Sequence, residues 1–134
     1  MSNTNDFREW IEKAEENCSM AQSALRRRKP LPNSSCFHAQ QCAEKYLKAM
    51  LVAHQRMFSK THDLVLLNDQ CAQGGIFVGV PPKRLNALSD YAVHTRYPGA
   101  TPTVGDAREA IETAKAVRAF ARKFLGIKPQ KKKR

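Results

Sequence analysis

Residues 33–54 read NSSCFHAQQCAEKYLKAMLVAH, and this stretch decides the fold. Its apolar residues recur at three- and four-residue spacing, as they do in an amphipathic helix. Because they cover most of the helix circumference, we expect this helix to lie at the centre of the protein. Asn33, Ser34 and Ser35 are good N-cap residues and predict its start, and we place its end near His54. A polar stripe remains on one side, formed by Gln40, Gln41, Glu44, Lys45 and Lys48.

Four more helices are predicted around this central one, because proline, glycine and capping residues interrupt the apolar pattern. Their expected spans are about Thr4–Arg28, Thr61–Gly74, Pro81–Pro98 and Val104–Leu125. Residues 76–80 are apolar but too few for a helix, so we expect a covered loop or a brief extended piece. No stretch of useful length alternates as a strand would. The predicted fold is therefore all-α, an up-down helical bundle of about five helices, three long and two short.

The chain of 134 residues is long enough for one domain, since such a chain buries about two-thirds of its unfolded surface. Shared helical spacing predicts the core, which we assign to Trp10, Ala43, Leu47, Met50, Ile111 and Val117. We expect residues 1–127 to form a helical bundle domain. Residues 128–134 read KPQKKKR and are expected to form a basic, disordered C-terminal tail.

The net charge of +11 is spread unevenly along the chain. Five of the 23 basic residues lie in the tail, which leaves 18 basic against 12 acidic residues, or +6, for the rest. Another basic cluster occupies residues 26–29, and it either favours a phosphate-rich partner or complements the C-terminal dipole of the first helix. The tail adds non-specific affinity for anions. One candidate function is therefore a basic RNA-binding protein that relies on the tail.

The sequence contains no pattern typical of a membrane, secreted, metal-binding or cofactor-binding protein. No apolar run approaches the roughly 18 residues that a membrane span needs, and the polar N-terminus lacks a signal-peptide core. We therefore expect a cytoplasmic protein with no membrane association. The four cysteines have no CxxC or zinc-site spacing, so we interpret them as inert buried thiols in a reducing compartment. Without a GxxxxGKS/T, GxGxxG or HExxH motif, we predict neither a metal nor a cofactor.

Polar groups that break an apolar pattern are the first candidates for a functional site. His62 can move a proton near neutral pH, and an arginine such as Arg56 or Arg96 can hold a phosphate in a forked geometry. Arg56 and His62 are separated by five residues in the loop before the third helix. Such a pair could cut RNA without a metal, with the ribose 2′-hydroxyl as the nucleophile. Alternatively, His62, Arg96 and Lys45 would form a cationic pocket for a nucleotide or RNA phosphate.

Each of these residues also has an ordinary structural explanation. His62 could only cap a helix, Arg96 could satisfy carbonyls at a helix end, and Arg56 could be a solvated loop side chain. The polar stripe on the central helix could be an exposed face, but we favour a subunit interface. Across the twofold axis of a homodimer, the following side chains can satisfy one another: Gln40, Gln41, Glu44 and Lys45.

Three phrases occur in a recognisable order, FHAQQCAEKYLK at 37–48, THDL at 61–64 and RYP at 96–98. In this order they closely resemble the HEPN domain family, named for higher eukaryotes and prokaryotes nucleotide-binding, over roughly residues 5–125. The resemblance implies a small helical bundle that usually dimerises and is commonly encoded beside, or fused to, a minimal nucleotidyltransferase. Many members resemble toxins of toxin–antitoxin pairs. Some act as metal-independent ribonucleases and use an Arg and a His four to six residues apart.

Our first hypothesis is accordingly a HEPN-like nucleotide- or RNA-binding module, the partner of a minimal nucleotidyltransferase in a toxin–antitoxin-type pair. The alternative is a metal-independent endoribonuclease toxin that uses Arg56 and His62. Met57 follows the arginine where ribonuclease members favour a polar residue. The THDL and RYP phrases are marks of the branch described as nucleotide-binding. The binding function therefore ranks first.

Overall fold

The computed structural model describes residues 6–93, 99 and 101–129 of the chain. Over these residues the backbone forms five α-helices, one short 3-10 helix and no strand. The elements are α1 (Phe7–Arg26), α2 (Pro32–Ala53), α3 (Leu64–Gln73), α4 (Pro82–Ser89), η1 (Asp90–Ala92) and α5 (Val104–Phe124). The predicted all-α fold, with three long and two short helices, is confirmed.

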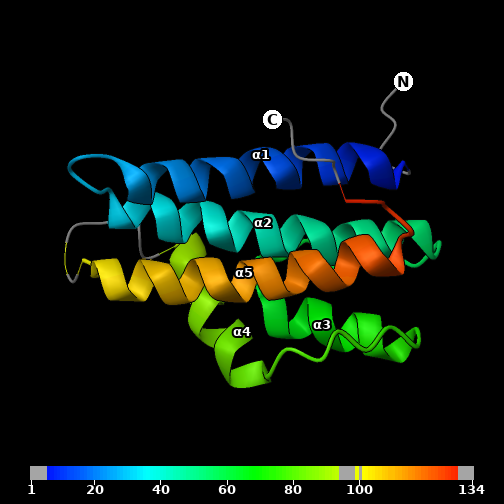
Figure 1. The fold of residues 1–134 in the computed structure, drawn as a ribbon. Helices are drawn as coiled ribbons and strands as arrows, with labels where there is room; N and C mark the ends of the chain where they lie inside the picture. Colours follow the sequence, from blue (N-terminus) through cyan, green and yellow to red (C-terminus); the bar gives the residue numbers. More distant parts are fainter. Residues whose placement is uncertain (1–5, 94–98, 100, 130–134) are drawn as a thin grey trace.

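Helix α2 occupies the centre of the bundle (Figure 1). Helices α1 and α5 pack along it, and α3, α4 and η1 also contact it. Helix α1 runs opposite to α2, whereas α5 runs in the same direction as α2. The up-down order therefore holds, with the third leg divided between α3 and α4. Within the described part of the chain, each helix is too short or too polar to cross a bilayer.

Helix α2 begins slightly earlier than the sequence predicts. Pro32 stands in its first turn, where the fixed φ and the missing N–H of proline are tolerated. The predicted caps, residues 33–35, therefore lie inside the helix, and that prediction is wrong. Ser35 instead donates a hydrogen bond of 2.8 Å to the carbonyl oxygen of Ala21. This buried bond ties the start of α2 to α1.

Helix α3 is capped by Asp63 and begins at Leu64, three residues after Thr61, where the sequence predicts its start. Oδ1 of Asp63 accepts hydrogen bonds from the backbone N–H groups of Val65 and Leu66, at 2.9 and 3.3 Å. Oγ1 of Thr61 accepts from the N–H of Asp63 at 3.0 Å and supports the cap from outside the helix. The carboxylate is the better cap because its charge also suits the positive end of the helix dipole.

The last helices differ in how well their ends match the prediction. Helix α4 ends at Ser89 and continues as η1 only to Ala92, so it is shorter than predicted. Residues 94–98, which the prediction included, lie outside the described residues. Helix α5 starts where predicted, at a capping box in which Thr103 and Asp106 each accept the backbone N–H of the other, at 3.0 and 2.9 Å.

The apolar segment before α4, residues 76–80, agrees with the prediction of a covered loop or a brief extended piece. Ile76, Val78 and Val80 are buried, whereas Phe77 between them is 71% exposed. Alternating burial of this kind is typical of an extended backbone that lies on a core. The segment has no strand partner among the described residues, and its buried side chains belong to the core of the bundle.

Five of the six predicted core residues are buried, namely Ala43, Leu47, Met50, Ile111 and Val117. Trp10 is the exception, because it lies at the rim of the core and is only half-buried. Its ring meets the ring of Phe58 edge-on, with 5.6 Å between the ring centroids. A ring of this size often covers a core without being enclosed by it.

All four cysteines are buried and free. Cys18 on α1 and Cys42 on α2 share a hydrogen bond, which lowers the pKa of Cys18 to about 6 against the opposing effect of burial. The same bond and burial raise the pKa of Cys42. Nε2 of Gln22 donates a further hydrogen bond of 3.3 Å to Sγ of Cys18. The predicted burial of the cysteines is therefore confirmed, and the hydrogen bond between Cys18 and Cys42 moves their two pKa values in opposite directions.

A polar clamp joins the three long helices. Nε and Nη2 of Arg118 on α5 donate to the two carboxylate oxygens of Glu15 on α1, at 2.6 and 2.9 Å. The hydroxyl of Tyr46 on α2 donates to the same carboxylate. Burial raises the pKa of Glu15, but the hydrogen bonds from Arg118 and Tyr46 outweigh it and lower this pKa overall. The clamp fixes the three helices relative to one another with directional contacts that apolar packing does not supply.

Candidate functional site

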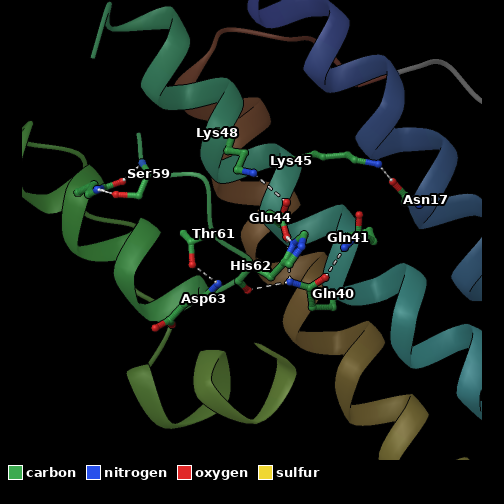
Figure 2. Close-up of polar contacts among 11 residues, drawn as sticks. Asn17, Gln40, Gln41, Glu44, Lys45, Lys48, Ser59, Thr61, His62 and Asp63 are labelled. Atoms are coloured by element: carbon green, nitrogen blue, oxygen red, sulfur yellow. Dashed lines mark hydrogen bonds and ion pairs between the residues drawn. The ribbon is translucent and has the colours of Figure 1, made fainter. Parts of the chain in front are cut away.

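Polar groups gather where residues 55–63 fold back along α2 (Figure 2). The segment leaves the C-terminal end of α2 and brings His62 to Glu44, near the middle of the helix. Helix α3 starts directly afterwards, and the N–H of Leu64 donates to Oγ of Ser89 at the end of α4, at 2.8 Å. His62 is therefore attached directly to α2, and Leu64, two residues later, is attached to the end of α4.

Glu44 is the centre of this cluster and is only 4% exposed. Its Oε1 receives Nδ1 of His62 at 2.8 Å and Nε2 of Gln40 at 3.1 Å, and its Oε2 accepts from Nζ of Lys48 at 2.9 Å. Burial raises the pKa of Glu44, but the hydrogen bonds from Lys48, His62 and Gln40 outweigh this and lower it below its usual value. The buried carboxylate is therefore held in its charged form.

Gln40 is fully buried and connects the two sides of the cluster. Besides its bond to Glu44, Nε2 of Gln40 donates to the backbone carbonyl oxygen of His62 at 3.0 Å. Oε1 of Gln40 accepts from Nε2 of Gln41 at 2.7 Å, so both ends of the amide are used. His62 is thus attached to α2 by its ring and by its main chain, while 56% of its side chain remains exposed.

Aromatic rings cover the other end of the cluster. The ammonium group of Lys48 lies 5.7 Å from the ring centroid of Trp10 and 5.3 Å from that of Phe58. Cation–π attraction from both rings adds to the ion pair with Glu44. The Lys48 and Glu44 side chains are 10% and 5% exposed, so this is a buried ion pair with every charge matched.

Lys45 belongs to a second branch, directed toward α1. Its Nζ donates to Oδ1 of Asn17 at 2.7 Å, and Nδ2 of Asn17 lies 2.9 Å from Nδ1 of His38. Burial lowers the pKa of Lys45, and burial together with the charge of Lys45 lowers the pKa of His38. The structure therefore ties Lys45 to α1, whereas His62 is tied to Glu44.

Arg56 and His62 lie at opposite ends of α3. The side chain of Arg56 packs over Gly74, just beyond the last residue of α3: a Cβ added to Gly74 would lie 2.4 Å from Cδ of Arg56. His62 precedes the first residue, and the ten residues of α3 lie between, a length of about 15 Å. A single chain therefore does not bring Arg56 and His62 together. Arg96 lies outside the described residues.

Two polar residues of this region were not predicted as site residues. Lys48 was recognised only as part of the stripe on α2, although it is the charge partner of Glu44. Asn17 was not singled out, yet it is buried and links Lys45 to His38. A signal for Asn17 was present, because it interrupts the apolar face of α1 between Ala14 and Ala21.

The comparisons with known proteins agree with this architecture. A family model described as HEPN domain matches residues 7–124. The chain therefore belongs to the HEPN domain family, a class of nucleotide-binding or ribonuclease-type modules. It is similar to the crystal structure of TT1696 from Thermus thermophilus, with a TM-score of 0.71 and 28% identity over 89% of this chain and 98% of that one. No curated protein matches the chain.

Proposed function

We propose that the protein is a binding module for a nucleotide or RNA phosphate, and the partner of a minimal nucleotidyltransferase in a toxin–antitoxin-type pair. The observation that carries the binding function is the half-exposed imidazole of His62, held from behind by the buried carboxylate of Glu44. The ion pair between Glu44 and Lys48 and the two hydrogen bonds donated by the Gln40 side chain are more than packing requires. Apolar residues of similar volume would fill the same space equally well. The common product of the ion pair and the two hydrogen bonds is a fixed, accessible histidine.

The phosphate ligands in this proposal are His62, Arg96 and Lys45. His62 is accessible, and Lys45, which directly follows Glu44 on α2, is half-buried and bonded to Asn17; Arg96 enters from the sequence alone. The net charge of +11 adds long-range attraction for a polyanion. Binding should therefore weaken as salt rises, because each phosphate contact releases counterions.

A binding and cleavage experiment tests this function directly. The full-length protein is incubated with a fluorescent oligoribonucleotide at low and high salt, with EDTA present. We expect salt-sensitive binding without cleavage, and a loss of about tenfold or more in affinity for His62→Ala, since a hydrogen bond to a charged group contributes about 1.5–3 kcal/mol. Arg96→Ala should weaken binding in the same way.

The matched control is His54→Ala, which removes an exposed histidine from the end of α2. Equal affinity for the wild type, His62→Ala and Arg96→Ala would reject the proposed pocket. Cleavage in EDTA that both His62→Ala and Arg56→Ala abolish would instead establish the alternative, a metal-independent endoribonuclease toxin. Because Arg56 and His62 lie at opposite ends of α3, that enzyme would need Arg56 from one subunit and His62 from another.

The homodimer is proposed around the part of α2 that its own chain covers only in part. HEPN domains often dimerise, and between residues 35 and 51 of α2 the half-buried residues are Phe37, His38, Gln41 and Lys45. Gln40 and Glu44, predicted for this interface, are buried inside the subunit and satisfied there. In the proposed dimer, Gln41 and Lys45 therefore meet the partner, while Gln40 and Glu44 support them from within.

Sedimentation of the purified protein at tens of micromolar tests the dimer. We expect a dimer for the wild type and a monomer for Gln41→Arg, because a new charge at the centre of a twofold interface meets its own copy. Gln73→Arg makes the same change at an exposed position on α3 and should stay dimeric. A monomeric wild type would reject the dimer.

The nucleotidyltransferase partner is tested separately, by co-purification with the product of any neighbouring nucleotidyltransferase gene.

A further inference from the structure

We propose that Glu44 is a positioning residue that fixes the tautomer of His62, with the proton on Nδ1 and Nε2 presented to the ligand. The inference rests on the proposed function in one respect, namely that His62 is the group that meets the ligand. The position of the ring proton and the direction of the ring follow from the contacts that Glu44, Gln40 and Lys48 make around His62 (Figure 2).

The position of the proton follows from the charge of Glu44. An ionised carboxylate only accepts hydrogen bonds. Because Nδ1 of His62 lies 2.8 Å from Oε1 of Glu44, the ring nitrogen must be the donor. Lys48 occupies the other carboxylate oxygen at 2.9 Å and keeps the group charged. In neutral His62 the single ring proton is therefore on Nδ1, and Nε2 carries a lone pair.

The direction of the ring follows from its two attachments. Glu44 binds the ring at Nδ1, and Gln40 binds the main-chain carbonyl of the same residue at 3.0 Å. Both partners are buried on α2, whereas 56% of the His62 side chain is exposed. Nδ1 lies on the buried side, so the opposite edge of the ring, which carries Nε2, faces outward.

This arrangement defines what His62 can bind. Neutral His62 accepts a hydrogen bond at Nε2 from a donor, such as a ribose hydroxyl. Protonated His62 donates from Nε2 to an acceptor such as a phosphate oxygen, and the charge of Glu44 balances the imidazolium. An imidazole with its proton on Nε2 would have the reverse preference while neutral. Glu44 therefore sets the hydrogen-bonding character of the site without touching the ligand.

The test is a proton–nitrogen correlation spectrum of the isotope-labelled full-length protein, recorded without ligand at a pH where the histidines are neutral. The signals of His62 are assigned by their loss in His62→Ala. We expect the proton on Nδ1 in the wild type. In the double variant Glu44→Met, Lys48→Met, which removes both charges of the buried pair, we expect this preference to be lost. Glu112→Met, Lys115→Met is the matched control, because it removes an exposed acid and base from α5.

A second variant keeps the test decisive if the double variant unfolds. Glu44→Gln can both donate and accept, so it should also weaken the preference for Nδ1–H. A wild-type proton on Nε2, or an unchanged tautomer in folded Glu44→Met, Lys48→Met or Glu44→Gln, would overturn the inference. RNA binding separates it from the proposed function. If binding is indifferent to His62→Ala while the tautomer responds to Glu44, the function fails and the positioning role of Glu44 stands.

Discussion

Lys48→Met should lower the free energy of unfolding by about 3–5 kcal/mol, the usual cost of leaving one charge of a buried ion pair without its partner. The substitution keeps most of the side-chain volume beside the rings of Trp10 and Phe58, so packing is largely preserved. What it removes is the ammonium group that balances Glu44 in a site only 5% exposed. Urea unfolding followed by circular dichroism at neutral pH measures the change.

Adding Glu44→Met to Lys48→Met should restore most of the lost stability, because apolar groups often replace a complete buried ion pair with little cost.

The pH dependence of the free energy of unfolding gives a second check on the ion pair between Glu44 and Lys48. Since the folded-state pKa of Glu44 is lowered, its contribution is present above the unfolded-state pKa and is lost as pH falls through the folded-state pKa. The double variant should therefore lose less stability in acid than the wild type. A single variant as stable as the wild type would show that the pair is not buried.

Leu47→Ala should lower the free energy of unfolding by about 2–5 kcal/mol, because it deletes a fully buried side chain and leaves a cavity. Leu47 has no exposed surface and lies on the face of α2 that packs into the core. The surrounding helices are held by the clamp at Glu15, which restricts how far they can collapse into the space. Thermal and urea unfolding of the variant measure the loss.

Leu66→Ala is the control for this core substitution. Leu66 is 39% exposed on α3, and we expect its truncation to change stability by about half a kcal/mol or less. A similarly small loss for Leu47→Ala would place Leu47 outside the core and contradict the central position of α2.

The sequence predicts the helices well because their apolar periodicity is strong. Helix α2 shows this best, since an apolar surface over most of its girth leaves only a central position open to it. Its start was misplaced because residues 33–35 are good caps in isolation, whereas Pro32 fits the first turn and Ser35 finds a tertiary partner in Ala21. Local preferences of this kind compete on nearly equal terms, and tertiary contacts decide between them.

The sequence points to residues of the candidate site, but it does not show which of them contact one another. The polar stripe of α2 and the THDL phrase identify Glu44 and His62 as residues to examine, yet spacing alone pairs His62 with Arg56. The pairing seen in the structure depends on residues 55–63 folding back along α2. That path is a tertiary property, because nothing in the local sequence says whether a loop continues away from a helix or returns along it. For the same reason the stripe was assigned to a subunit interface, although Gln40 and Glu44 find their partners within the chain.

One of the aromatic rings that cover Lys48 belongs to a tryptophan, so fluorescence can report on the cluster around Glu44. Trp10 is the only tryptophan in the chain, so emission excited selectively from tryptophan, and not from the three tyrosines, comes from a single known place. The indole lies at one end of a continuous line of contacts that runs through Lys48 and Glu44 to His62. A ligand that changes the charge on His62 alters the electric field along this line. We therefore expect the tryptophan fluorescence of the unlabelled protein to change when a ligand binds at His62 as proposed.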